Sequence, residues 1–134
     1  MKRATTFLLM MVVLVLVSQT VPSTAASNPT FDMTGGWKDS IGDTLQLFQE
    51  KDEVNGIYVN SVGFAHRLEG RYVSLTKAKL TMIRRTRSSG CETTMTVDVT
   101  ANSANSITLN SIATENACGL TIGQNFPGTA TRLQ

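Results

Sequence analysis

The sequence contains few of the residues on which metal sites and catalytic sites depend. It has one histidine, His66, and two cysteines among its 134 residues. These are too few for the ligand set of a structural zinc site. No serine or cysteine stands beside a histidine in a recognisable nucleophile pattern. We therefore predict a non-enzymatic protein without a metal or other cofactor.

Charge and aromatic bulk are also scarce, at 16% and 6% of the residues. The positive excess is small, with 12 Lys and Arg against 10 Asp and Glu. It disappears if Lys2 and Arg3 belong to a cleaved leader, because 10 of each sign then remain. A general nucleic-acid binder needs a surplus of cations to displace counterions, so we expect no nucleic-acid partner.

Residues 1–26 have the three parts of a secretory signal peptide: a basic start, an apolar run and a small-residue end. The apolar run, Phe7 to Val17, has 11 residues. That is shorter than the roughly 20 apolar residues that cross a bilayer as a helix. The sequence therefore predicts a signal peptide over residues 1–26 and a single domain over residues 27–134. The mature protein is expected to be secreted or periplasmic, with no membrane span.

Beyond residue 30 the hydrophobic pattern alternates with the period of two that a half-buried strand requires. The clearest run is Met95, Val97 and Val99, and a similar set extends from Leu80 through Met82 to Arg84. Turns rich in Gly, Asn, Ser and Asp separate such segments about every ten residues. Eight strands are predicted, over residues 33–40, 44–51, 54–61, 66–74, 79–87, 93–100, 106–114 and 128–133.

The short connections make consecutive strands antiparallel neighbours. An open meander leaves two unpaired edges, and closure into a barrel removes both. We therefore predict an all-β protein, an eight-stranded antiparallel up-and-down β-barrel. An open sandwich of two sheets is the alternative.

The two cysteines, Cys91 and Cys118, lie just outside the sixth and seventh predicted strands. An oxidising compartment would allow them to pair. We predict a disulfide that clamps the open end of this hairpin.

The register of the same hairpin is predicted from its apolar residues. Val97 opposite Leu109 puts apolar side chains on one face, but it leaves the cysteines three positions out of step. A β-bulge near Ile112 would absorb the difference.

Glycine and aromatic residues in the first strands form an ordered pattern that resembles the avidin/streptavidin family. That family shows G-x-W-x-N-x-x-G-S, then G-x-Y, a Val-Gly and a G-R-Y-like strand at similar spacing. The last strand, residues 128–133, is similar to the closing strand of the family. The match covers residues 35–73 and 128–133, and it implies a closed barrel of the calycin type. The matching segments are Gly35-Gly36-Trp37, Ile41-Gly42-Asp43, Asn55-Gly56-Ile57-Tyr58, Ser61-Val62-Gly63 and Leu68-Glu69-Gly70-Arg71-Tyr72.

A Trp in the first strand and a basic residue in the last are also shared with lipocalins and fatty-acid-binding proteins. First and last strands are neighbours in a closed meander, so Arg132 can lie over the indole of Trp37. A guanidinium on an indole face contributes roughly 0.5–2 kcal/mol. We interpret both residues as closing the barrel floor rather than as ligand contacts.

The resemblance implies a ligand site inside the barrel mouth, but a ligand other than biotin. The family uses an Asn, a Ser and a Tyr to donate hydrogen bonds to the ureido oxygen, at positions occupied here by Asp39, Asp43 and Tyr58. An ionised carboxylate only accepts hydrogen bonds. The chain also has a single Trp, whereas the family lines its pocket with several. The predicted rim of the site is completed by Ile41, Asn60, Val62 and Gly63.

A mouth with two carboxylates favours a cationic or donor-rich ligand, such as an amine or a guanidinium. The alternative is that Asp39 and Asp43 stand in solvent at a turn, where aspartate is common.

A second candidate surface is a run of basic residues without any acid among them. It predicts either an anionic partner, such as a polysaccharide or an acidic protein, or a solvated rim that discourages edge pairing. The alternative function is thus an inhibitor or surface adhesin with a filled barrel, which works through its loops or through this strand. The run comprises Lys77, Lys79, Arg84, Arg85 and Arg87.

Overall fold

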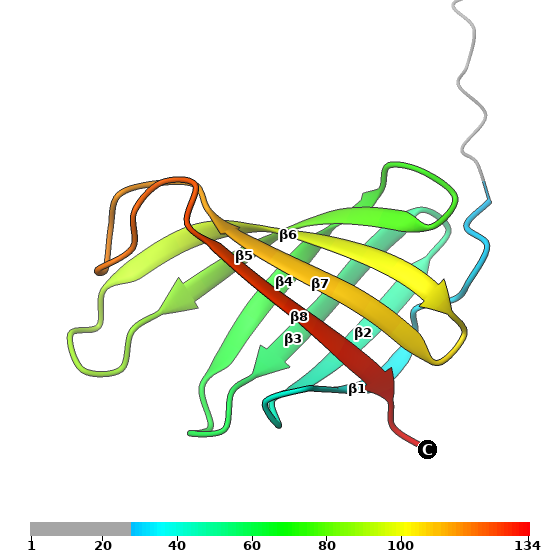
Figure 1. Cartoon of the computed structure of the whole chain (residues 1–134), viewed down its shortest axis with the longest axis horizontal. Coiled ribbons are helices and arrows are strands. Elements are labelled where there is room, and N and C mark those ends of the chain that lie inside the picture. Colours follow the sequence, from blue (N-terminus) through cyan, green and yellow to red (C-terminus); the bar gives the residue numbers. More distant parts are fainter. Residues whose placement is uncertain (1–27) are drawn as a thin grey trace, which may run out of the picture.

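The computed structural model describes residues 28–134, which form a closed barrel of eight antiparallel strands (Figure 1). Each strand pairs with the next, and the first also pairs with the last, so the predicted up-and-down β-barrel is confirmed and the open sandwich is wrong. The predicted signal peptide, residues 1–26, lies outside the described residues. The strands are β1 (Gly35–Asp39), β2 (Thr44–Glu50), β3 (Glu53–Val59), β4 (Ala65–Tyr72), β5 (Lys77–Arg85), β6 (Glu92–Ser103), β7 (Ser106–Ala113) and β8 (Asn125–Arg132).

Every predicted strand overlaps one observed strand, but the predicted register of the β6–β7 hairpin is wrong. Val97 lies opposite Ser111, two positions from the expected partner. The cause is the turn: β6 continues to Ser103, and the irregularity lies between Ala101 and Ser103 instead of near Ile112. A shift of two positions leaves every side chain on its expected face.

Inward-facing side chains form an apolar core in the lower part of the barrel. Burial alternates along the strands, as in β5, where Ala78, Leu80 and Met82 are buried between exposed neighbours. The largest buried side chains include Met33, Trp37, Leu47, Leu68, Leu80, Met95 and Ile107.

Among residues 28–134, no helix is long and apolar enough to cross a membrane.

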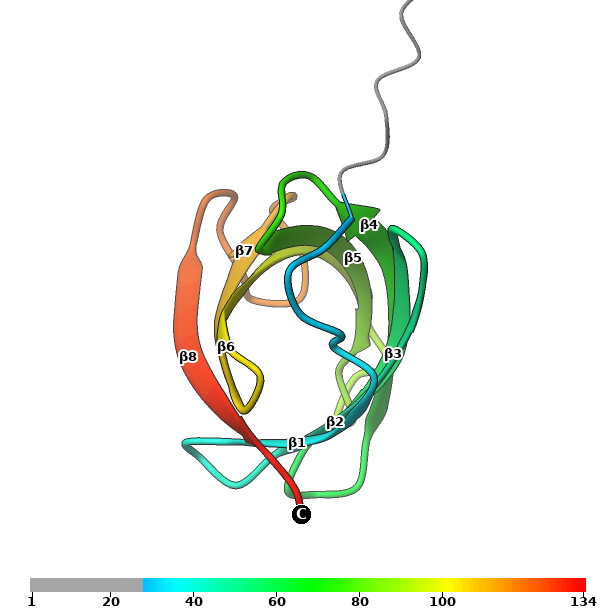
Figure 2. The same cartoon turned by 90° about the vertical axis from the view of Figure 1, so that its right-hand side faces the viewer.

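One end of the barrel, which we call the floor, is sealed by the segment that precedes β1. Figure 2 shows this segment, residues 28–34, crossing the end of the barrel. The indole Nε1 of Trp37 donates to the carbonyl of Met33 at 2.9 Å, and the side chain is only 1% exposed.

The predicted stacking of Arg132 on Trp37 is present, with the guanidinium carbon 4.3 Å from the ring centroid. The two residues are partners in the β1–β8 ladder. The guanidinium also donates to the carbonyls of Asp32 and Thr34, at 2.7 Å and 2.5 Å. Arg132 therefore joins the first strand, the last strand and the floor segment at one point.

The opposite end, which we call the mouth, is formed by four loops, residues 40–43, 60–64, 86–91 and 114–124. The predicted disulfide is confirmed, and it ties two of these loops together. Cys91 and Cys118 are bonded with their Cα atoms 5.6 Å apart, across a sequence separation of 27. The disulfide is compatible with an oxidising extracellular or periplasmic compartment.

Replacing both Cys91 and Cys118 with serine is expected to destabilise the protein by about 3 kcal/mol, because the unfolded chain gains the freedom of the opened loop. For a domain of this size the melting temperature should fall by more than about 10 °C. Thermal unfolding followed by circular dichroism measures the change. A reductant should lower the melting temperature of the unmodified protein to that of the variant and should not affect the variant. Equal melting temperatures with and without the disulfide would contradict the clamp.

Candidate functional site

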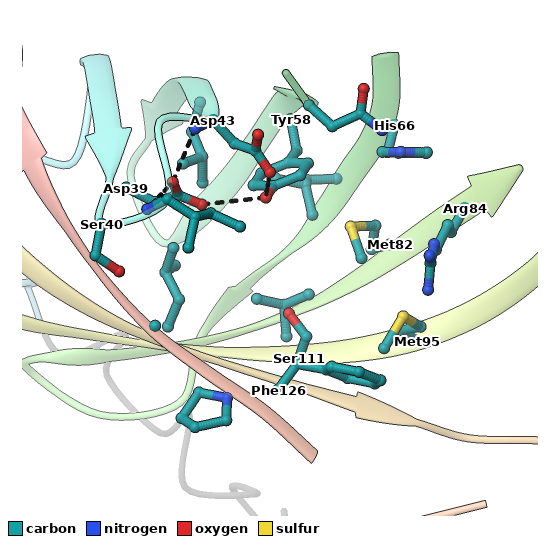
Figure 3. Close-up of a pocket in the computed structure, with 18 residues that line it drawn as sticks. Asp39, Ser40, Asp43, Tyr58, His66, Met82, Arg84, Met95, Ser111 and Phe126 are labelled. Atoms are coloured by element: carbon teal, nitrogen blue, oxygen red, sulfur yellow. Dashed lines mark hydrogen bonds between the residues drawn. The ribbon is translucent and has the colours of Figure 1, made fainter. Parts of the chain in front are cut away.

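The mouth opens into a cavity of about 300 Å³ inside the barrel (Figure 3). This volume lies at the lower end of the range for small-molecule sites. All eight strands contribute to the lining, so the cavity is the unfilled upper part of the barrel interior. Its apolar wall includes Leu45, Leu68, Met82, Met95, Val97 and Leu109, with Phe126 and Pro127 nearer the opening.

One side of the cavity carries two carboxylates that meet at a single tyrosine. The hydroxyl of Tyr58 lies 3.1 Å from Oδ2 of Asp39 and is also in hydrogen-bond contact with Oδ2 of Asp43. A phenol has one proton, so it can satisfy only one of these two oxygens at a time. Burial, followed by the hydrogen bond to Asp43, raises the pKa of Tyr58, so the hydroxyl keeps that proton.

The other carboxylate oxygens are held by backbone amides. Oδ1 of Asp39 accepts hydrogen bonds from the N–H groups of Ile41 and Asp43, at 3.0 Å and 2.8 Å. Oδ1 of Asp43 accepts from the N–H of Ser61 at 2.7 Å. These bonds fix the orientation of both carboxylates toward the cavity. Asp43 is only 5% exposed, so the alternative that both aspartates stand in solvent is wrong.

Beyond Tyr58 the polar lining continues with His66 on β4 and then Arg84 on β5, as Figure 3 shows. His66 pairs with Tyr58 in the β3–β4 ladder, and the two rings are stacked with their centroids 6.1 Å apart. His66 is 4% exposed, and within residues 28–134 its buried Nδ1 has no hydrogen-bond partner. Burial, and secondarily the charge of Arg84, lowers the pKa of His66, so the ring is neutral near pH 7.

Five of the predicted ligand-site residues line this cavity: Asp39, Ile41, Asp43, Tyr58 and Asn60. The other two, Val62 and Gly63, do not belong to the lining. They form the tip of the loop between β3 and β4, where Val62 is 61% exposed. Oδ1 of Asn60 accepts the N–H groups of Val62 and Phe64, and this turn carries the loop tip away from the lumen.

The sequence interpretation missed His66, Arg84, Ser111 and Phe126 as lining residues. A signal was present for Arg84, which follows Leu80 and Met82 at the strand period of two and therefore shares their inward face. The sequence interpretation grouped Arg84 with the other basic residues of the run and so overlooked that its side chain faces inward.

The basic run does not form one surface. Lys77, Lys79 and Arg85 project outward from β5, whereas Arg84 lies on the inward face. Nζ of Lys79 lies 3.8 Å from a carboxylate oxygen of Asp98, and the guanidinium of Arg87 lies 5.4 Å from the centroid of the Phe64 ring. The positive charge is thus divided between the lumen, the outer wall and the mouth.

No protein-family model matches the sequence, and no curated protein is significantly similar to it. Among the described residues, no three His, Cys, Asp or Glu side chains come together in a way that could hold a metal ion. The chemistry of the cavity lining therefore carries the functional interpretation.

The lowered pKa of His66 predicts a pH dependence of stability that replacement of the residue should reduce. The unfolded chain binds the imidazole proton more readily than the folded one, so stability is lost as the pH falls through the ordinary histidine pKa of about 6.5. We expect His66→Gln to lose less stability than the unmodified protein between about pH 7.5 and pH 5.5. Urea denaturation at both pH values measures the difference. Equal losses would contradict a buried neutral imidazole.

Proposed function

We propose that this protein is a secreted, avidin-like barrel protein that binds a small cationic ligand, other than biotin, in its mouth. The observation that carries the proposal is the convergence of the Asp39 and Asp43 carboxylates on one Tyr58 hydroxyl inside an open cavity. The disulfide between mouth loops supports an exported protein.

The hydrogen-bond arrangement favours a ligand that brings N–H donors. Backbone amides satisfy Oδ1 of Asp39 and Oδ1 of Asp43, but the two Oδ2 atoms share the single proton of Tyr58. The oxygen that does not receive this proton needs another donor. An ammonium or guanidinium group supplies N–H donors together with positive charge, and such charge-assisted bonds are stronger than neutral ones.

The rest of the lining favours a ligand with a short hydrocarbon portion. Leu45, Leu68 and Leu109 present apolar surface below the carboxylates, and the methionines Met82 and Met95 can adapt to an irregular shape. A barrel that is filled with side chains, as the inhibitor or adhesin alternative requires, is less well supported, because about 300 Å³ of the lumen is open.

Biotin fits this lining poorly. Its ureido oxygen is an acceptor and would face carboxylates, which are acceptors as well. Each lost hydrogen bond to a buried polar group costs roughly 1–3 kcal/mol. The only Trp of the chain, Trp37, is buried under Arg132 at the floor and is not part of the cavity lining.

Calorimetry at neutral pH should show that pentylguanidinium binds at least about tenfold more tightly than the neutral pentylurea, which has the same shape, because only the former is charge-complementary. Asp39→Asn should remove most of this preference. Asp98→Asn on the outer wall is the matched control and should preserve it. Biotin should bind no more tightly than about micromolar, given its lost hydrogen bonds. Equal affinity for the two pentyl compounds, or nanomolar biotin binding, would refute the proposal.

A further inference from the structure

The cavity has a second polar group, on the far side of the lumen from the aspartates. In the closed order of eight strands, β1 and β5 are separated by three strands in either direction, so Asp39 and Arg84 approach the cavity from opposite walls. Figure 3 shows His66 and Arg84 together on one side and Asp39 and Asp43 on the other.

Arg84 has no carboxylate of its own among residues 28–134. Within this part of the chain, the outer wall of the barrel carries three ion pairs, and none of them includes the guanidinium of Arg84. The pairs are Arg67–Glu69, Arg71–Glu53 and Lys79–Asp98. Arg84 faces the lumen beside Met82, whose side chain offers no strong acceptor, and it is thus available to an anion from outside.

His66 is a second polar residue of the cavity lining and lies next to Arg84. The side chain is 96% buried, since its exposed fraction is 4%, yet Nδ1 has no partner in the described part of the chain. Buried polar atoms without a partner are rare, and each one costs stability. His66 lies beside Arg84 in the β4–β5 ladder, because their neighbours Arg67 and Ile83 are paired. Because Nδ1 is closed to solvent, an anion at Arg84 would receive its hydrogen bond from the other ring nitrogen, Nε2, of the neutral imidazole.

We propose that Arg84 and His66 form an anion subsite, so that the ligand of this cavity is a zwitterion with a carboxylate at one end and an ammonium or guanidinium at the other. This inference rests on the proposed function, which accounts only for recognition of the cationic end of the ligand. A carboxylate balances the single positive charge of Arg84 and can accept two parallel hydrogen bonds from its guanidinium. The two ends would bridge the lumen, with the hydrocarbon portion of the ligand against Leu68 and Met82.

The test compares L-arginine with agmatine, which is arginine without its carboxylate. Calorimetry should show L-arginine bound at least about tenfold more tightly, as expected for one charge-assisted pair. Arg84→Gln should remove this advantage and should weaken L-arginine binding without weakening that of agmatine, which has no carboxylate to lose a partner. Arg85→Gln, the adjacent position on the outer face, is the matched control and should behave like the unmodified protein. Circular dichroism and melting temperature verify that each variant is folded.

The outcomes separate the two proposals. If agmatine binds and L-arginine binds no more tightly, the anion subsite is wrong and the cation site stands. If neither binds, hexanoate serves as a probe of the anion subsite alone, followed by NMR shifts. Hexanoate binding that Arg84→Gln abolishes would support the subsite and overturn the cation site. No hexanoate binding would overturn both.

Discussion

The pairing of β1 with β8 is the interaction on which the rest of the structure depends. It brings Trp37 and Arg132 together, and the guanidinium then holds the segment before β1 across the floor through the carbonyls of Asp32 and Thr34. Because one end is sealed in this way, the open volume of the barrel is confined to the other end. A sheet without this closure would have two exposed edges and no enclosed site.

Closure of the barrel also determines which side chains lie together inside the mouth. Side chains alternate between lumen and solvent, so most strands offer the mouth only one or two residues. The polar residues at these positions come from β1, β3, β4 and β5 and from the loop before β2, whereas β6 to β8 contribute mainly apolar ones. The resulting half-ring starts at the carboxylates, passes through the Tyr58 and His66 rings and ends at Arg84. The cavity is therefore electrostatically polar, with negative charge at the aspartates and positive charge at Arg84.

Much of the fold could be predicted from sequence, because alternation and turn residues are local signals. The eight strands and their closure follow from them, and the disulfide follows from the presence of two cysteines at the ends of one predicted hairpin. The β6–β7 register does not follow, since it depends on the irregularity between Ala101 and Ser103. The carboxylate side of the site was found through a resemblance in the first strands. Arg84 was missed because it was grouped with its neighbours along the chain instead of by its face. The burial of His66 is set by the packing of the barrel mouth, which no local pattern encodes.

The most direct measurement of whether the mouth is the binding site is a backbone amide NMR titration of the protein with L-arginine. The structure predicts shift changes at residues of β1, β3, β4 and β5 near the mouth, around Asp39, Tyr58 and Arg84. The indole N–H of Trp37, bonded to Met33 at the floor, should not move. Shifts concentrated on the outer wall around Lys77 and Lys79, or no shifts at millimolar ligand, would contradict a ligand site inside this barrel.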